Sequence, residues 1–521
     1  MGQWGDFGYA VRYHFGYERI LAHFYGRTVR ATLGSLHRAP NPTLRVLILE
    51  NMNLATNVGY DPVVTSAASF TVQSSTTVTP TPTTTVPPTT TVPPTTTVPP
   101  TTTAPTTTTA PTTTTVPPPP TTAPTTVPPA PATTVAPTTV QPTTTVAPTT
   151  VQPTTTAPSP GVLSVPAGAA VDLRLEANGT WSAYEGPSCT AARGIGAQRA
   201  PVATGLVNPV VAPESESSNA PRADLLTLCR HDGVDETLRG RIEAYDHSGY
   251  ERTLNLVSLQ SYLDGVVPAE ESAAWGLAGA APGAPQGEPW GFQALEAQAV
   301  AARSYAVASV ANGGWAGYAD ICDTDYCQAY VGANFEYPIT DRAVRDTIGE
   351  VRVERGSTAV VATRYSASSG GWTVPSAFPA VPDLGDACVV PSDPLECNPN
   401  HTWRVSLSGA RIARRFRTVG PLLGLRVIAR NRRGALGGRA LEVLLTGARA
   451  SVRMSGAQFA AALGLRSNWI AVARVTRVGR ALPLPTTTTT TTVPLTTVPP
   501  TTVPPTTVPP TTVPTTVPPP S

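Results

Sequence analysis

The chain has 521 residues, of which 58 are prolines, and long runs of threonine and proline take much of this length out of any folded core. About 380 residues lie outside these runs, enough for one large domain or two modest ones. The formal net charge is +2, and all 36 basic residues are arginines. A net charge this close to zero gives no overall positive electrostatic field that would indicate a nucleic-acid partner. No apolar run reaches about 18 residues, the length that predicts a membrane-spanning helix.

The first 75 residues predict a short helix and a strand. Apolar residues recur at helical spacing over 20–25, and Gly26 is a suitable residue to end that helix. Segment 44–49 predicts a strand. His14 and His23 also lie here, and we expect both to have structural rather than catalytic roles.

Residues 76–160 consist of threonine, proline and valine repeats. With almost no charge or large apolar side chain, they predict a disordered linker with extended polyproline character. Closing a long loop costs only about 0.6 kcal/mol more per doubling of its length, so the first 75 residues can still fold onto the domain that follows. A similar repeat over 483–521 predicts a disordered tail.

The region between the repeats, residues 161–482, predicts a mixture of strands and helices. Segments 171–175, 239–245 and 252–259 predict strands, and segment 359–365 predicts another. A helix is expected from about 289 to 311, with one buried stripe, and a shorter one over 456–463. Gln298 and Arg303 lie about 140° apart around the longer helix, so they cannot share one face. The predicted fold class is α+β, with a mixed, sheet-rich domain around a central alanine-rich helix.

Six cysteines fall into three pairs that are close in sequence, and an even number at close spacing suits disulfides in an exported protein. A zinc site would need a CxxC spacing that the chain lacks. The aspartates at 320, 323 and 325 lack the turn glycine and distal glutamate of a calcium loop. We therefore expect neither a metal nor a cofactor, and we expect three disulfides, although sequence alone does not fix their connectivity: Cys189 with Cys229, Cys322 with Cys327, and Cys388 with Cys397.

Residues 254–306 carry the most specific pattern in the chain. It reads Tyr-Leu-x-Gly-Val-Val-Pro-x-Glu, followed by a helix with Leu-x-Ala-Gln-Ala-Val-Ala-Ala-Arg-Ser-Tyr-Ala. This pattern closely resembles the catalytic core of the sporulation protein D and amidase-enhancer LytB (SpoIID/LytB) family. The matching positions are Tyr262, Leu263, Gly265, Val266, Val267, Pro268, Glu270, Leu295, Ala297, Gln298, Ala299, Val300, Ala301, Ala302, Arg303, Ser304, Tyr305 and Ala306.

Further segments resemble the same family. Residues 328–332 match its Gln-x-Tyr-x-Gly segment, residues 368–371 its Ser-Ser-Gly-Gly loop, and residues 463–467 its closing motif. Glycines allow a close approach of the backbone to a ligand, and serine hydroxyls can hydrogen-bond a sugar. The substrate-binding residues that the resemblance implies are Gln298, Arg303, Tyr305, Gln328, Tyr330, Ser368, Ser369, Gly370 and Gly371.

The first residues, Met1-Gly2-Gln3-Trp4-Gly5, resemble the second half of another family motif, Gly-His-Gly-x-Gly-Met-(Ser/Gly)-Gln-(Tyr/Trp)-Gly-Ala. We expect Met1 to be an internal methionine, with a signal peptide and the Gly-His-Gly part encoded upstream. In many relatives this motif ends the domain, so its place at the start predicts a circular permutation.

The resemblance implies a secreted peptidoglycan lytic transglycosylase that cleaves glycan strands with Glu270 as general acid and base. An apolar setting can raise the pKa of a glutamate so that it keeps its proton near neutral pH. Glu271-Ser272 departs from the Met-Pro that many relatives have here. A charge on Glu271 would raise the pKa of Glu270 if both faced the site, but adjacent side chains usually point apart. The alternative function is a non-catalytic, peptidoglycan-binding amidase enhancer.

The resemblance further implies an extracellular or cell-wall location, with peptidoglycan glycan strands and a cell-wall amidase as partners. Neither nucleic acid nor an integral membrane segment is expected. The arginine-only composition and threonine/proline stalks suggest an actinobacterial-type protein, which favours wall growth or division over sporulation. The predicted organisation is residues 1–75 as the N-terminal part of the domain, 76–160 as linker, 161–482 as the catalytic domain and 483–521 as tail.

Overall fold

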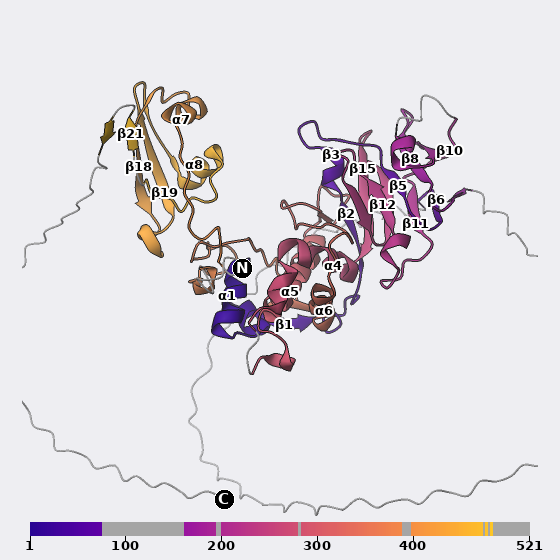
Figure 1. Ribbon diagram of the computed structural model, residues 1–521, viewed down its shortest axis with the longest axis horizontal. Helices are drawn as coiled ribbons and strands as arrows, with labels where there is room; N and C mark the ends of the chain where they lie inside the picture. The colour runs from indigo at the N-terminus through magenta and orange to yellow at the C-terminus, as the bar shows by residue number, and fades with distance from the viewer. Residues whose placement is uncertain are drawn as a thin grey trace, which may run out of the picture. The chain divides into compact units, whose positions relative to one another are not determined.

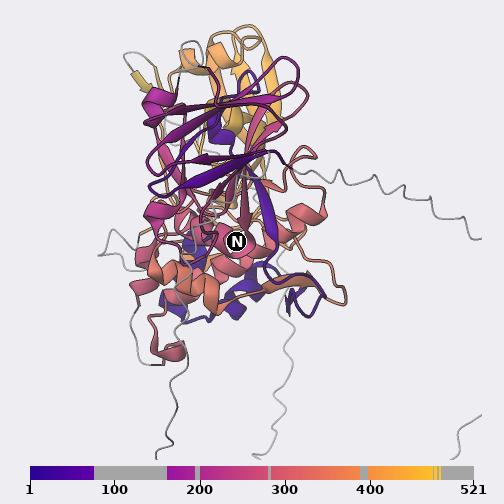
Figure 2. The same cartoon turned by 90° about the vertical axis from the view of Figure 1, so that its right-hand side faces the viewer.

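The computed structural model describes residues 1–75, 161–193, 200–279, 283–387 and 397–472, together with two short strands at 475–477 and 480–482 (Figures 1 and 2). The predicted linker and the predicted tail lie outside the described residues. The chain divides into two compact units. Unit 1 comprises Met1–Leu47 and Val257–Ser521, and unit 2 comprises Ile48–Leu256.

Unit 2 is built mainly of antiparallel strands. One six-stranded sheet has the order β10-β9-β8-β5-β12-β13. Strands β7, β6, β11, β14 and β15 pair in that order. Segments on both sides of the predicted linker meet here, because β5 pairs with β8 and β6 pairs with β7. The strands are β3 (Met52–Asn53), β4 (Val58–Gly59), β5 (Val63–Thr65), β6 (Phe70–Gln73), β7 (Val162–Val165), β8 (Ala170–Leu175), β9 (Trp181–Gly186), β10 (Ala203–Leu206), β11 (Val210–Pro213), β12 (Leu226–Cys229), β13 (Asp235–Leu238), β14 (Arg241–Asp246) and β15 (Glu251–Ser258), with the short helix α3 (Cys189–Ala192) beside them.

Unit 1 gathers helices around α5. They are α1 (Gln3–Tyr13), α2 (Tyr17–Phe24), α4 (Leu259–Glu270), α5 (Phe292–Ala311) and α6 (Pro338–Asp346). Strand β1 (Thr28–Thr32) pairs antiparallel with β17 (Glu350–Glu354), and β2 (Thr43–Leu47) pairs parallel with β16 (Ile321–Cys322). Figure 1 shows α1, from the start of the chain, beside α5.

Helix α5 is buried on all its faces over residues 292–304, where one buried stripe was expected. The stripe prediction was wrong because α1, α2, α4, α6 and β17 all pack against this helix. Its many alanines allow that close approach, and Ala294, Ala297 and Ala301 share a core with Phe7, Leu21 and Phe24.

The C-terminal part of unit 1 has a core of its own. Strands β18 (Leu422–Arg430), β19 (Ala440–Gly447) and β20 (Ser451–Ser455) form an antiparallel sheet, with α7 (Gly409–Arg415) and α8 (Gly456–Leu463) beside it. Ser455 and Gln458 form a capping box at the start of α8, which confirms the helix predicted at 456–463. Strands β21 (Val475–Arg477) and β22 (Arg480–Leu482) form a hairpin.

The α+β class with several sheets is confirmed, but the strand predicted at 359–365 is wrong. This segment forms only an isolated bridge between Val353 and Val360. It then leaves β17, because its later backbone groups bond the start of the chain: the Ser366 amide donates to the Met1 carbonyl oxygen at 3.0 Å. Among the described residues, no helix is both long and apolar enough to cross a membrane.

Candidate functional site

Glu270 is the last residue of α4, which follows directly on β15. The helix begins at Ser258, whose side chain accepts a hydrogen bond from the Ser261 amide. Pro268 lies in the last turn, where it has no amide to donate to the helix, and the helix ends with Glu271 as its C-cap. The backbone therefore fixes the position of the Glu270 carboxyl at the C-terminal end of a buried helix.

Two donors from distant parts of the chain hold the Glu270 carboxyl. The Gln3 side chain donates from Nε2 to Oε2 at 2.9 Å, and the Ala329 amide donates to Oε1 at 2.7 Å. Burial raises the pKa of Glu270 above its ordinary value. The two donors oppose this rise because they favour the ionised form, whereas the nearby charge of Asp325 adds to it. The carboxyl is thus fixed in orientation and retains its proton more readily than an exposed glutamate does.

Gln3 also connects Glu270 to the Ser-Ser-Gly-Gly loop. Its backbone amide donates to the Ser366 carbonyl oxygen at 2.9 Å, while its side chain bonds Glu270. The next amide, that of Trp4, donates to Ala367 at 3.1 Å. The first turn of α1 therefore lies between the glutamate and the loop, two segments that the sequence places about 100 residues apart.

Glycines in α1 permit this close packing. A Cβ at Gly5 would overlap the Asp383 carboxylate, and one at Gly8 would overlap the backbone of Gly385. Gly385 belongs to the short 3-10 helix η6 (Leu384–Asp386), which packs against α1. The close packing of α1 against η6 thus explains why glycine is needed at these positions near the start of the chain.

A buried chain of hydrogen bonds supports the segment that supplies the Ala329 amide. The neighbouring Gln328 is 1% exposed and donates from Nε2 to the Tyr365 hydroxyl at 2.6 Å. Its Oε1 accepts from the Tyr262 hydroxyl at 3.2 Å. Tyr330 is 2% exposed, and its ring lies 4.9 Å from that of Tyr262. In this arrangement, Gln328 and Tyr330 position the backbone beside Glu270.

The Ser-Ser-Gly-Gly loop is held by a buried carboxylate. Asp386, fully buried, accepts from the Ser368 hydroxyl at 2.9 Å and from the Ser369 amide at 2.8 Å. His401 Nδ1 lies 2.8 Å from the other oxygen of Asp386. This hydrogen bond raises the pKa of His401, so the imidazole favours its charged form.

Gly370 and Gly371 have φ values of +72° and +104°, which favour glycine. These two residues are half-buried. They therefore form the accessible part of the loop, whereas the serine side chains are engaged in holding it.

Gln298 and Arg303 of α5 are both buried. Arg303, 1% exposed, donates to the carbonyl oxygens of Val344 at 2.9 Å and Glu350 at 3.2 Å, so it joins α5 to α6 and β17. Gln298 is fully buried, and among the described residues neither polar atom of its side chain has a hydrogen-bond partner. Tyr305, further along the helix, is half-buried. Neither Gln298 nor Arg303 presents its polar group to solvent.

Two of the three predicted disulfides are present. Cys189 pairs with Cys229 in unit 2, and Cys322 pairs with Cys327 in unit 1. Cys388 lies outside the described residues, so its pairing with Cys397 stays a prediction. The Cys322–Cys327 bond closes the loop directly before Gln328 and Ala329, and it thereby restricts the backbone that bonds Glu270.

Sequence reasoning did not assign several residues around this site. Gln3 and Ala329 lie in segments that resemble family motifs, and this resemblance was the only sequence feature that connected them with the site. Asp383, Asp386 and His401 had no such signal, because no periodic pattern or recognised motif includes them and they reach the site only through tertiary contacts.

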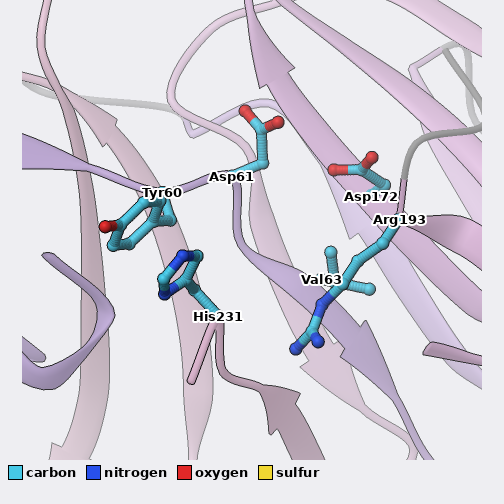
Figure 3. Close-up of a pocket in the computed structure, with 6 residues that line it drawn as sticks. All are labelled: Tyr60, Asp61, Val63, Asp172, Arg193 and His231. Carbon is cyan, nitrogen blue, oxygen red and sulfur yellow. The ribbon is translucent and has the colours of Figure 1, made fainter. Parts of the chain in front are cut away.

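A separate cavity of about 190 Å³ lies in unit 2 (Figure 3). The Tyr60 and His231 rings stack at its side, with centroids 3.7 Å apart. Asp172 is 1% exposed, and burial raises its pKa to about 6. The remaining lining residues are Asp61, Val63 and Arg193. None of these residues belongs to the recognised motifs, and the cavity shares no residue with the Glu270 site.

Comparison with known proteins gives one family match. Residues 247–353 match the family model described as Stage II sporulation protein (SpoIID). The matched span includes α4, Glu270, α5 and the Cys322–Ala329 segment, and it ends before the Ser-Ser-Gly-Gly loop. No curated protein and no solved structure matches the chain.

Proposed function

We propose that this chain, which carries a SpoIID domain at residues 247–353, is a peptidoglycan lytic transglycosylase with Glu270 as its general acid and base. The SpoIID domain implies remodelling of cell-wall peptidoglycan and therefore a location outside the cytoplasm. Cleavage of the glycan strand by transglycosylation is the specific activity proposed here.

The observation that carries the proposal is the state of the Glu270 carboxyl. Burial raises the pKa of Glu270, and each of its two carboxyl oxygens accepts a hydrogen bond from a different donor, so the carboxyl has a fixed orientation. A general acid needs a proton near neutral pH and a fixed direction toward the leaving group. An exposed glutamate at the end of a helix would have neither property.

The reaction can proceed with this single carboxyl. Glu270 donates its proton to the glycosidic oxygen as the bond from that oxygen to the anomeric carbon breaks. The carboxylate then accepts a proton from the sugar's own 6-hydroxyl as that oxygen bonds the anomeric carbon. The product is a 1,6-anhydro sugar, Glu270 is protonated again, and no water is consumed.

The surrounding residues have different roles in this proposal. The Ser-Ser-Gly-Gly loop offers the backbone of Gly370 and Gly371 to the glycan, and Tyr305 is half-buried. Gln298, Arg303, Gln328 and Tyr330, as well as the hydroxyls of Ser368 and Ser369, would act indirectly, because they are buried or engaged with protein partners. Substrate binding by the whole set stays a prediction.

The test is mass spectrometry of products formed from intact glycan strands and from strands freed of stem peptides. We expect anhydro-sugar products from the wild-type protein and none from Glu270→Gln. Glu354→Gln removes an exposed carboxylate of the same unit and should leave the products unchanged. Reducing-end products would identify a hydrolase instead.

Absence of products from both substrates, together with retained glycan binding, would contradict the enzyme proposal. It would favour the amidase-enhancer alternative, in which the same site binds peptidoglycan without cleaving it. Stimulation of a cell-wall amidase by Glu270→Gln as strongly as by the wild-type protein would be the direct measure of that function.

A further inference from the structure

Two departures from the family pattern meet in this structure. The motif at the start of the chain ends in alanine in the family, and Asp6 stands at that position. Many relatives have methionine after the catalytic glutamate, and Glu271 stands there. Asp6 lies in the first turn of α1, Glu271 directly follows α4, and their carboxyl groups lie within reach of each other. Both departures therefore place an acid where the family motif has an apolar residue.

The two carboxyl groups are removed from solvent. Asp6 is fully buried and Glu271 is 2% exposed. Among the described residues, no group donates a hydrogen bond to any of their four oxygens. Two ionised carboxylates cannot hydrogen-bond each other, and burying both charges would cost several kcal/mol. At least one of the two groups must therefore carry a proton.

Among the described residues that act on the pair, none is an arginine or a histidine. Those acting on Asp6 are Asp383, the amino group of Met1 and the Phe7 amide, in addition to Glu271. Glu270 acts on Glu271 from the same helix end, and Tyr25 faces both carboxyls. Burial is the largest cause that raises the pKa of each acid, and Asp383 and Glu270 add like charges. All the side-chain charges near the pair favour retention of the proton.

We propose that Asp6 and Glu271 share one proton and form a singly charged acid pair that acts as a positioning unit for Glu270, keeping Glu270 in its acid form. Glu271 follows Glu270 directly in the sequence, and the two carboxyl groups interact electrostatically. A like charge at short range disfavours ionisation of Glu270. The catalytic part of this inference depends on the proposed role of Glu270, whereas the shared proton does not.

The informative variant is Asp6→Ala/Glu271→Met, which restores the residue types of the family pattern and removes both carboxyls. We expect the alkaline limb of the pH–rate profile to move to lower pH by about one unit or more, the size typical of interacting carboxyls. Asp6→Ala alone or Glu271→Met alone should move the alkaline limb by a similar amount. The one buried carboxyl that remains takes up a proton, so the negative charge of the pair is lost. Asp6→Asn/Glu271→Gln keeps the shape of the pair and serves if the apolar variant fails to fold.

A second measurement needs no activity. The infrared difference spectrum between the wild-type protein and Asp6→Asn/Glu271→Gln should show the band of one protonated, buried carboxyl at neutral pH, and the same difference measured in a Glu270→Gln background should retain it. Loss of glycan cleavage together with retention of this signal would overturn only the proposed function. An unchanged infrared signal in the double variant would overturn the shared proton. An alkaline limb that stays in place or moves to higher pH would overturn the effect on Glu270.

Discussion

The hydrogen bond from Gln3 to Glu270 makes a prediction of definite sign. Gln3 is 3% exposed, and its Nε2 donates to Glu270 Oε2 at 2.9 Å. A donor stabilises the ionised carboxylate more than the neutral acid, so this bond lowers the pKa of Glu270. Gln3→Met keeps the length of the side chain and removes the donor. We therefore expect the pKa of Glu270 to rise further.

The magnitude follows from the strength of such bonds. A hydrogen bond to a charged group contributes about 1.5–3 kcal/mol, and one pKa unit corresponds to about 1.4 kcal/mol. The expected rise is therefore about 1–2 units. Glu270 would keep its proton to higher pH, so the alkaline limb of the pH–rate profile should move upward by that amount. The backbone bond from Gln3 to Ser366 is unaffected, so the loop should remain in place.

The assay is the initial rate of anhydro-product formation across the pH range, measured under conditions where the rate reports kcat/KM. Gln260→Met changes another glutamine near the opposite end of α4 and is the matched control. A limb that stays in place would refute the reasoning, because it would mean that the Gln3 bond does not bear on the ionisation that limits the rate. A shift to lower pH would refute it as well.

Two further predictions concern the framework of the site. Gly8→Ala should destabilise unit 1 by about 1–3 kcal/mol in urea denaturation, because the new methyl group would overlap the backbone of Gly385, whereas Gly26→Ala has open space and should change the free energy of unfolding by under about 0.5 kcal/mol. Arg303→Met should cost at least about 2 kcal/mol because it leaves buried carbonyl oxygens of Val344 and Glu350 without their donor, and the KM of the folded protein should stay unchanged. Equal stability of Gly8→Ala and Gly26→Ala, or a raised KM without loss of stability for Arg303→Met, would contradict these expectations.

Local sequence patterns predicted much of the secondary structure. Periodicity located α8, and alternation located β8, because these signals depend only on neighbouring residues. The strand expected at 359–365 failed for the opposite reason. Its composition favours a strand, but tertiary hydrogen bonds direct its later residues to the start of the chain. Context of that kind overrides intrinsic strand preference.

The candidate site was predictable where a motif supplied it. Glu270 and the Cys322–Cys327 pair followed from recognised patterns, and the disulfide is present. The role of Arg303 could not be predicted, because a buried arginine inside a motif looks the same in sequence whether it bonds a ligand or a backbone carbonyl. Asp386 and His401 are joined only by folding, and no spacing rule relates them to the Ser-Ser-Gly-Gly loop.

The acid pair lies between these two cases. Each departure from the family pattern was visible in the sequence, but the contact between Asp6 and Glu271 was not, since the two residues lie 265 positions apart in the chain. The two adjacent acids have different partners: Glu270 accepts hydrogen bonds from Gln3 and Ala329, whereas Glu271 lies against Asp6. In the proposal, the charge of the Asp6–Glu271 pair affects Glu270 without direct contact, because electrostatic interactions extend beyond hydrogen-bond distance.

The ionisation of Glu270 is thus set by opposing contributions that both reach it through the first turn of α1. Gln3 donates a hydrogen bond that favours the carboxylate, and Asp6 completes a pair whose charge favours the acid. Gln3→Met and Asp6→Ala/Glu271→Met are therefore predicted to move the same pH limb in opposite directions. A general loss of packing at the start of α1 would move it in one direction only, so the two variants together separate electrostatic control of Glu270 from simple structural support.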